Sequence, residues 1–347
     1  MKNMLALLSF LVIVGSLFSH AEAADSAAGK QIKVGLALGG ALGDQAYNDM
    51  QYKGLIEAAE KFDIAVAYRV PDALGAEQNL LANFTKILTE LAEQEGCDLI
   101  IINSFQAIEP LDEVAANYPQ KFFVLLDGVA KPRDNVASTT YAAHEGSFVV
   151  GALAAYVSQT KKVGMIGGVD LPIIKSFLKG FEEGLAYADP AAQLTTEYVS
   201  KFPDFSGFGN PQRGYELANQ LYEQGVDVIY AAAGSTGNGV IQAASEQQKY
   251  VIGVDSDQDY LAPGFVLTSM MKRLDVSIVN LCQLFMEGKL TGSTVYEYSY
   301  KNGGISITDM KFTKEKIPAD VLENIRAIER KIAAGEIHVT NILAKQP

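Results

Sequence analysis

The sequence contains no tryptophan, two cysteines and three histidines among its 347 residues. Neither Cys97 nor Cys282 has the CxxC or Cys/His spacing of a metal or redox site. Both stand in apolar surroundings, which favours buried free thiols over a disulfide. The sequence also lacks HExxH and GxSxG motifs. It therefore predicts a protein without a metal or cofactor and without catalytic residues, that is, not an enzyme.

Positive charge is scarce. The chain has 28 Lys and Arg residues against 41 Asp and Glu residues, and its formal net charge is −13. Because it has no basic cluster, this balance argues against nucleic acid and anionic lipid surfaces as partners. The composition, 48% hydrophobic and 20% charged, is typical of a globular protein. The length suits two domains of about 100–200 residues each.

Only the N-terminus carries a long apolar run. Lys2 precedes a mostly apolar stretch over residues 4–18, and Ala21-Glu22-Ala23 forms a small-x-small cleavage site. This layout predicts a signal peptide over residues 1–23. The run is shorter than the roughly 20 residues of a membrane-spanning helix. No cysteine stands at the predicted cleavage site, so we expect a mature chain that is free in the periplasm, without a lipid anchor or a membrane span.

After residue 31, short apolar segments alternate with amphipathic ones. Runs such as 99–102 and 122–126 show no polar alternation, which is typical of parallel strands covered by helices on both faces. A second series of the same kind begins after Tyr141, so the chain predicts two similar doubly wound α/β lobes. We expect strands over residues 32–38, 65–70, 99–102, 122–126, 163–166, 194–199, 226–231, 250–254, 265–269, 295–300 and 305–307, and helices over 52–61, 77–95, 145–158, 172–185, 213–223, 240–247, 274–286 and 319–334.

Two glycine-rich turns follow predicted strands, at Gly39-Gly40 and at residues 234–239. Backbone N–H groups in such turns can bind phosphate. Neither turn has a Walker lysine or matches GxGxxG, so we interpret them as close-packed turns that border a cleft at the carboxyl ends of the strands.

Carboxylates also end two strands. Asp127 follows the apolar run 122–126, and Asp255 follows 250–254. Each carboxylate can accept hydrogen bonds from two hydroxyl groups, as on the vicinal diol of a sugar. A cap or turn residue is the alternative interpretation.

Several aromatic residues fall outside the regular core pattern. Tyr47 stands just past the first glycine turn, and Phe202, Phe205 and Phe208 stand in an irregular segment. Aromatic residues beside a cleft can stack on a flat ligand, and filling of the core is the alternative.

Four glycine-containing segments occur in order along the chain. They are Gly39-Gly40-x3-Asp44-x-Ala46-Tyr47-Asn48, the segment 164–184, the segment 227–240, and Gly253-Val254-Asp255-x-Asp257-Gln258 with 268–272. Together they resemble the basic membrane protein (BMP) family of ABC-transporter substrate-binding proteins, whose best-understood members are purine nucleoside receptors. Many family members carry an acidic residue after the first strand, where this chain has Gly39-Gly40, and Tyr47 and Ala46 replace the usual Phe and Ser.

The resemblance implies a type I periplasmic-binding-protein fold, with two doubly wound lobes joined by a multi-strand hinge. We expect an N-terminal lobe of residues 31–142 plus 272–304 and a C-terminal lobe of residues 143–271 plus 305–347. The resemblance also implies a nucleoside-like ligand that binds between the lobes without being chemically changed, and an inner-membrane ABC permease as partner. We expect the protein to be a monomer.

Roles in ligand binding are implied by position. Tyr47 would stack on the base, with Phe208 or Phe177 opposite. Asp127, Asp255 and Lys272 would bind the ribose or its surroundings, and Asn48 and Gly234 would line the pocket. Three alternatives stay open: a hydrolase-like enzyme that uses Asp127 or Asp255 on nucleosides, a sugar or other small-metabolite receptor on the same fold, and a receptor that feeds a sensor.

Overall fold

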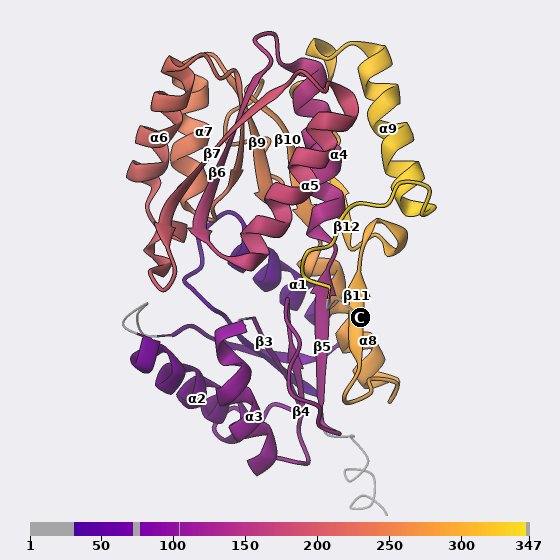
Figure 1. The fold of residues 1–347 in the computed structure, drawn as a ribbon. Helices are drawn as coiled ribbons and strands as arrows, with labels where there is room; N and C mark the ends of the chain where they lie inside the picture. Colours follow the sequence, from indigo (N-terminus) through magenta and orange to yellow (C-terminus); the bar gives the residue numbers. More distant parts are fainter. Residues whose placement is uncertain (1–30, 72–76, 104, 345–347) are drawn as a thin grey trace, which may run out of the picture. The chain divides into compact units, whose positions relative to one another are not determined.

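The computed structural model describes residues 31–71, 77–103 and 105–344. The predicted signal peptide, residues 1–23, lies outside the described residues. In the described part of the chain, the helices and strands belong to a compact unit that begins at Ile32. The strands form two six-stranded sheets (Figure 1).

The first sheet has the strand order β11-β5-β4-β3-β1-β2, and its neighbouring strands run parallel. Strand β3 is buried along its whole length, which explains its uninterrupted apolar sequence. Helices α2 and α3 cover one face, where Phe84 and Leu111 are buried. Helices α1 and α8 cover the other face with Leu55 and Ile278. The bounds are β1 (Lys33–Ala37), α1 (Tyr47–Phe62), β2 (Ala65–Arg69), α2 (Glu77–Glu93), β3 (Leu99–Ile102), α3 (Ile108–Asn117), β4 (Phe122–Leu125), β5 (Val136–Tyr141), α8 (Leu274–Met286) and β11 (Val295–Tyr298).

The second sheet has the order β12-β10-β9-β8-β6-β7, and only β12 runs antiparallel to its neighbour among the described strands. Helices α6 and α7 cover one face with Leu217 and Val240. Helices α4, α5 and α9 cover the other with Leu153, Phe181 and Ile328. The bounds are α4 (Ala143–Val157), β6 (Lys162–Asp170), α5 (Pro172–Ala188), β7 (Gln193–Lys201), α6 (Pro211–Glu223), β8 (Val228–Ala232), α7 (Thr236–Glu246), β9 (Tyr250–Asp255), β10 (Val266–Lys272), β12 (Ile305–Ile307) and α9 (Ala319–Ala333).

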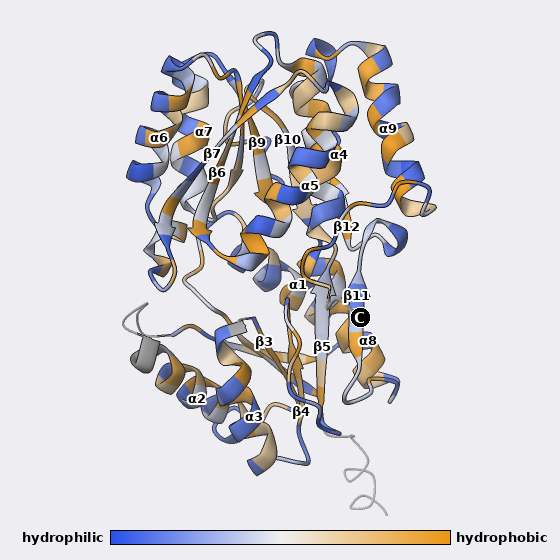
Figure 2. Ribbon diagram, in the orientation of Figure 1, coloured by the Kyte–Doolittle hydropathy of each residue, from blue (hydrophilic) through white to orange (hydrophobic). Residues whose placement is uncertain are grey.

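The two sheets repeat one topology. Strands β1 to β5 have the same spatial order as β6 to β10, so β4 corresponds to β9 and β5 to β10. This confirms the prediction of two similar doubly wound lobes. We call the first sheet with α1, α2, α3 and α8 the N-terminal lobe, and the second sheet with α4 to α7 and α9 the C-terminal lobe. Figure 2 shows hydrophobic residues along the strands of both sheets and hydrophilic residues on outer helices such as α6 and α9.

Within the described residues the chain crosses between the lobes at three places. It does so after Tyr141, after Lys272 and over residues 299–304. The last of these crossings contains the 3₁₀ helix η3 (Tyr300–Asn302). Other short 3₁₀ helices cover η1 (Phe105–Ala107), η2 (Phe205–Phe208) and η4 (Lys314–Lys316).

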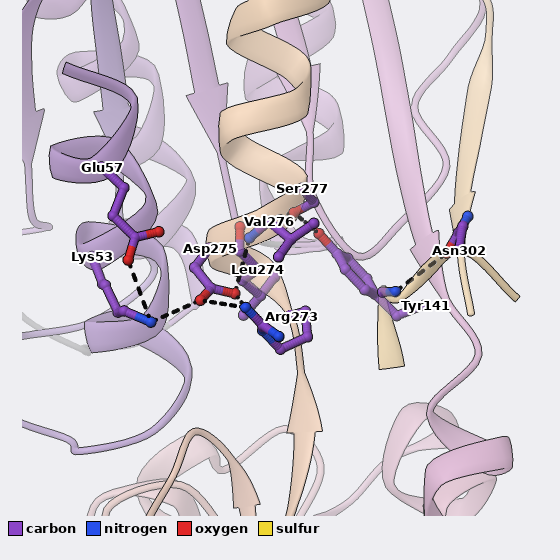
Figure 3. A network of polar contacts seen from close by, with 10 residues as sticks. Lys53, Glu57, Tyr141, Arg273, Leu274, Asp275, Val276, Ser277 and Asn302 are labelled. Atoms are coloured by element: carbon purple, nitrogen blue, oxygen red, sulfur yellow. Dashed lines mark hydrogen bonds and ion pairs between the residues drawn. The ribbon is translucent and has the colours of Figure 1, made fainter. Parts of the chain in front are cut away.

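A polar network holds the second crossing against the N-terminal lobe (Figure 3). Asp275, in the first turn of α8, is 1% exposed and accepts hydrogen bonds from Arg273 Nε at 2.9 Å and from Lys53 Nζ on α1 at 2.8 Å. Burial raises the pKa of Asp275, but the bonds from Arg273 and Lys53 outweigh it and leave the pKa below its ordinary value. On the same helix the Ser277 hydroxyl forms a hydrogen bond of 2.5 Å with the Tyr141 hydroxyl. Helix α8, which follows the second crossing, is therefore bonded to the residue at which the first crossing begins.

The structure contains two elements that the sequence pattern did not predict. Strand β5 includes Ser138 and Thr139, which break the apolar run but are buried. Their hydroxyl groups accept hydrogen bonds from the backbone N–H groups of Ala130 and Asp127, which compensates for that burial. Helix α3 carries Pro110 in its first turn, where proline is tolerated because no intrahelical acceptor faces its nitrogen. Helix α1 also begins earlier than predicted, at Tyr47.

Candidate functional site

A cavity of about 410 Å³ is lined by residues from both lobes. It lies where strands of the two sheets end, as expected for ligand sites in parallel α/β sheets. All the residues that were predicted to bind a ligand line this one cavity: Tyr47, Asn48, Asp127, Phe177, Phe208, Gly234, Asp255 and Lys272.

A buried ion pair joins the lobes inside the cavity. Lys272, the last residue of β10, is 2% exposed, and its Nζ donates to Asp127 Oδ2 at 2.6 Å. The Tyr47 hydroxyl donates to the same oxygen at 3.4 Å. The Lys272 ammonium also lies 5.3 Å from the centre of the Tyr47 ring and 5.0 Å from that of Phe177. Burial and the nearby Asp127 carboxylate raise the pKa of the Tyr47 hydroxyl well above its ordinary value, which keeps it a donor.

Asp127 and Asp255 occupy corresponding positions in the two lobes, at the ends of β4 and β9. Both have left-handed backbone conformations, with φ of 56° and 66°. Asparagine and aspartate tolerate this region better than most residues, which accounts for an aspartate at both positions. Their side chains nevertheless line the cavity, so a role in a turn does not exclude one in binding.

The Asp255 carboxyl is the less satisfied of the two. Its Oδ1 is buried and has no hydrogen-bond partner. Burial raises its pKa to about 6, with Lys272 opposing the shift and Asp127 and Asp44 adding to it. A buried acceptor without a partner is costly, so a donor supplied by a ligand would be favourable here.

The first glycine turn is fixed by a carboxylate at the start of α1. Asp44 accepts hydrogen bonds from the backbone N–H groups of Ala46, Asn48 and Asp49 at 2.8 to 3.1 Å. It also accepts one from Asn48 Nδ2 at 2.8 Å, which orients the Asn48 side chain. Asp44 itself lines the cavity. The Asp44-x3-Asn48 spacing is a sequence signal for this arrangement, because such side chains commonly satisfy the free N–H groups of a first helical turn.

Both glycine turns are close-packed, as predicted. A Cβ on Gly39 would lie 2.5 Å from Asn103 Oδ1. Gly234 has a φ of 57°, and a Cβ there would lie 3.1 Å from the Phe208 carbonyl oxygen. The Ser235 hydroxyl donates to that same carbonyl at 3.0 Å, which ties the second turn to the segment that carries Phe208.

The two sides of the cavity differ in chemistry. The N-terminal lobe supplies polar side chains, and the C-terminal lobe supplies a largely apolar wall. Of the aromatic residues singled out in the irregular segment, Phe205 and Phe208 line the cavity, whereas Phe202 is 55% exposed and stands edge-on to the Phe205 ring. Sequence reasoning missed several lining residues, because their relation to the site is set by tertiary contacts: Asn103, Gln106, Leu171, Ile173 and Ile174.

A second contact between the lobes lies beside the cavity. The Gln45 carbonyl oxygen, in the first glycine turn, accepts hydrogen bonds from the Ser256 hydroxyl and from Gln258 Nε2, the latter at 3.1 Å. Gln258 is 1% exposed, and its Oε1 accepts from the Val254 backbone N–H at 2.9 Å. Two residues that closely follow Asp255, Ser256 and Gln258, are therefore tied to the opposite lobe.

No group of three or more His, Cys, Asp or Glu side chains in residues 31–71, 77–103 and 105–344 is placed to hold a metal ion. None of the helices in these ranges is sufficiently long and apolar to span a bilayer. Cys97 and Cys282 are free and buried, on opposite faces of the first sheet, as predicted.

Two parallel α/β lobes, joined by several crossings and lining a shared cavity, define the class of periplasmic-binding-protein-like receptors. A structure of this type is the solute-binding protein of an ABC transporter system from Aeropyrum pernix K1, which is 26% identical, with a TM-score of 0.76, over 90% of this chain and 94% of that one. The fold predicted from the resemblance is thus confirmed.

The family follows from the sequence. The family model described as ABC transporter substrate-binding protein PnrA-like matches residues 31–342, and the chain belongs to this Bmp family. A CD4+ T-cell-stimulating antigen of Listeria innocua is 28% identical over 345 residues, covering 94% of this chain and 92% of that protein. The ABC transporter nucleoside-binding protein BmpA of Lactococcus lactis is 31% identical over 255 residues, covering 67% and 71%. The family consists of substrate-binding proteins, which implies a small-molecule ligand and a transporter permease as partner.

Proposed function

We propose that this chain is the periplasmic substrate-binding protein of an ABC importer and that it holds a purine nucleoside in the cavity between its lobes. The observation that carries the proposal is that aromatic rings and carboxylates line the same cavity. A flat base fits against Tyr47, Phe177 and Phe208, because aromatic rings offer large apolar faces. The cavity volume of about 410 Å³ is in the usual range of small-molecule sites.

The sugar hydroxyl groups are assigned to the carboxylates. Asp255 has a buried oxygen without a partner, and Asp127 is held in place by Lys272. An ionised carboxylate only accepts hydrogen bonds, which suits the hydroxyl donors of a ribose. Asn48 and Gly234 complete the proposed set by lining the cavity beside these groups.

The charge of the cavity favours a nucleoside over a nucleotide. Among the described residues, the charged lining side chains are Asp44, Asp127, Asp255 and Lys272, and Lys272 is already paired with Asp127. A phosphate group would therefore meet an excess of negative charge among the lining side chains.

The proposal includes the setting in which the protein works. Residues 1–23 would direct export, and the mature chain would act in the periplasm as a monomer that delivers its ligand to an inner-membrane permease. We assign residues 31–142 plus 272–304 to the N-terminal lobe and residues 143–271 plus 305–347 to the C-terminal lobe. The strands of the two sheets follow this division except that β10 ends at Lys272.

Calorimetric titration of the mature protein with inosine, guanosine, adenosine, inosine monophosphate and free ribose tests the proposal. We expect saturable binding of one nucleoside per chain and much weaker binding of the nucleotide and the sugar. Binding of a sugar but of no nucleoside would refute it. In the same samples, chromatography after long incubation should show intact nucleoside, whereas sustained release of free base would favour the hydrolase alternative.

A further inference from the structure

Gly39 and Asn103 lie side by side at the end of the first sheet. Gly39 follows β1 and Asn103 follows β3, and these two strands are neighbours. A Cβ on residue 39 would lie 2.5 Å from Asn103 Oδ1 and 2.8 Å from the Asn103 carbonyl oxygen. Real Cβ atoms do not approach other atoms so closely. The glycine therefore provides the space that the Asn103 amide occupies.

The Asn103 amide is poorly satisfied by the protein. The residue is 2% exposed and lines the cavity. Its Nδ2 makes one long hydrogen bond, 3.4 Å to Asn48 Oδ1, and its Oδ1 is buried without a partner. Buried side-chain polar atoms usually have partners in folded proteins, and the exceptions call for an explanation. A ligand in the adjacent cavity is a source of the missing donor.

Two kinds of polar side chain line the cavity, amides and carboxylates. Asn48 and Asn103 carry neutral amides, which can both donate and accept hydrogen bonds. Asp127 and Asp255 carry carboxylates, which in their ionised form can accept hydrogen bonds but cannot donate them. Amides form paired hydrogen bonds with the edges of purine bases, which present N–H donors beside acceptors. Because the carboxylates are assigned to the sugar hydroxyl groups, we assign the amides to the base.

Resting on the proposed function, we propose that Asn103 determines base specificity by accepting a hydrogen bond from an N–H group on the edge of the purine. Gly39 leaves the space that the Asn103 amide needs to face the cavity. The ligand class is therefore purine nucleosides that carry an N–H donor on the base, and purine ribosides without one are disfavoured.

Titration of wild type and Asn103→Leu with inosine and with unsubstituted purine riboside tests the inference, because only inosine carries an N–H on the six-membered ring. We expect wild type to prefer inosine by about tenfold, as for one neutral hydrogen bond in a buried site. We expect Asn103→Leu to lose this preference by binding inosine more weakly while its affinity for purine riboside stays close to that of wild type. Asn103→Asp, which keeps an acceptor and the volume, should retain most of the preference.

Two further variants sharpen the test. Gly39→Ala should also remove the preference, because its Cβ displaces the Asn103 amide. Asn117→Leu, on an exposed position at the end of α3 outside the cavity, should bind both ligands like wild type. If Asn103→Leu weakens both ligands equally, or neither, the inference is wrong although the proposed function stands. If wild type binds neither these two ligands nor guanosine or adenosine, the proposed function fails and the inference fails with it.

Discussion

The burial of Asp255 affects both its pKa and its contribution to stability. Its carboxyl lies among Lys272, Asp127 and Asp44, and burial dominates the shift of its pKa to about 6. An unfolded aspartate has a pKa of about 3.9, so folding favours the neutral form of this group. The contribution of Asp255 to stability is therefore greatest at low pH and is lost as the pH rises through about 6.

Ligand binding should show the opposite pH dependence. If Asp255 accepts hydrogen bonds from ligand hydroxyl groups, its ionised form is the binding form, and inosine affinity should fall as the pH drops from 7.5 to 5. Calorimetric titration across this range measures the effect. Asp255→Asn should bind more weakly at pH 7.5, by about tenfold or more, and its affinity should vary less with pH. A wild-type affinity that is constant over the range would contradict the assignment of Asp255.

Individual site residues differ in how far the sequence could predict them. Asp127 and Asp255 were found from their positions after apolar strands, and Tyr47, Phe208 and Lys272 from family resemblance. Asn103 follows a strand as well, but nothing in the sequence relates it to Gly39. That relation depends on the pairing of β1 with β3 and on a contact of 2.5 Å, both of which are tertiary.

At the scale of helices and strands, glycine positions set the packing of α4 against α5. A Cβ on Gly180 would lie 2.1 Å from the His144 carbonyl oxygen, and one on Gly184 would lie 2.0 Å from that of Phe148. The two helix backbones thus approach so closely that these positions leave no room for a side chain. An amphipathic pattern predicts such a helix, but it does not show which of its glycines are in contact with a neighbouring helix.

Two glycine-to-alanine variants test this packing. Gly184→Ala should lower the free energy of unfolding by about 1–3 kcal/mol, because the methyl group forces the helices apart. Gly237→Ala is the matched control in α7, where the nearest atom would be 3.7 Å away. It should be neutral or stabilise by up to about 1 kcal/mol, since alanine favours helix. Thermal unfolding of the two variants beside wild type is the measurement, and equal midpoints for all three would show that α4 and α5 are not in such close contact.

The elements themselves were largely predictable. Continuous apolar runs identified most strands, including β3 with its observed bounds. Strand β5 was not predicted because Ser138 and Thr139 interrupt its apolar sequence. Both are nevertheless buried, since their hydroxyl groups form hydrogen bonds inside the lobe. Helix α3 was not predicted because it contains Pro110, and proline disfavours helix at every position beyond the first turn.

At the scale of the whole molecule, the repeated topology places two equivalent aspartates, Asp127 and Asp255, at one cavity, one from each lobe. The crossings after Tyr141 and Lys272 lead directly from strands of one lobe into helices of the other. Contacts such as Lys272 with Asp127 and Gln258 with Gln45 then link the lobes around the site. A ligand that contacts both lobes would add to these links. Binding would therefore favour the arrangement in which the two lobes are closed on the cavity.

The central claim is that this cavity holds a purine nucleoside. The most direct measurement is mass spectrometry of the released small molecule. The full-length sequence is expressed, the protein is purified under native conditions, and denaturation then releases what it holds. The account predicts a purine nucleoside in up to one equivalent per chain, absent from a preparation of the Asp255→Asn variant or present in a smaller amount. A bound molecule without a purine ring, recovered at the same stoichiometry, would contradict it.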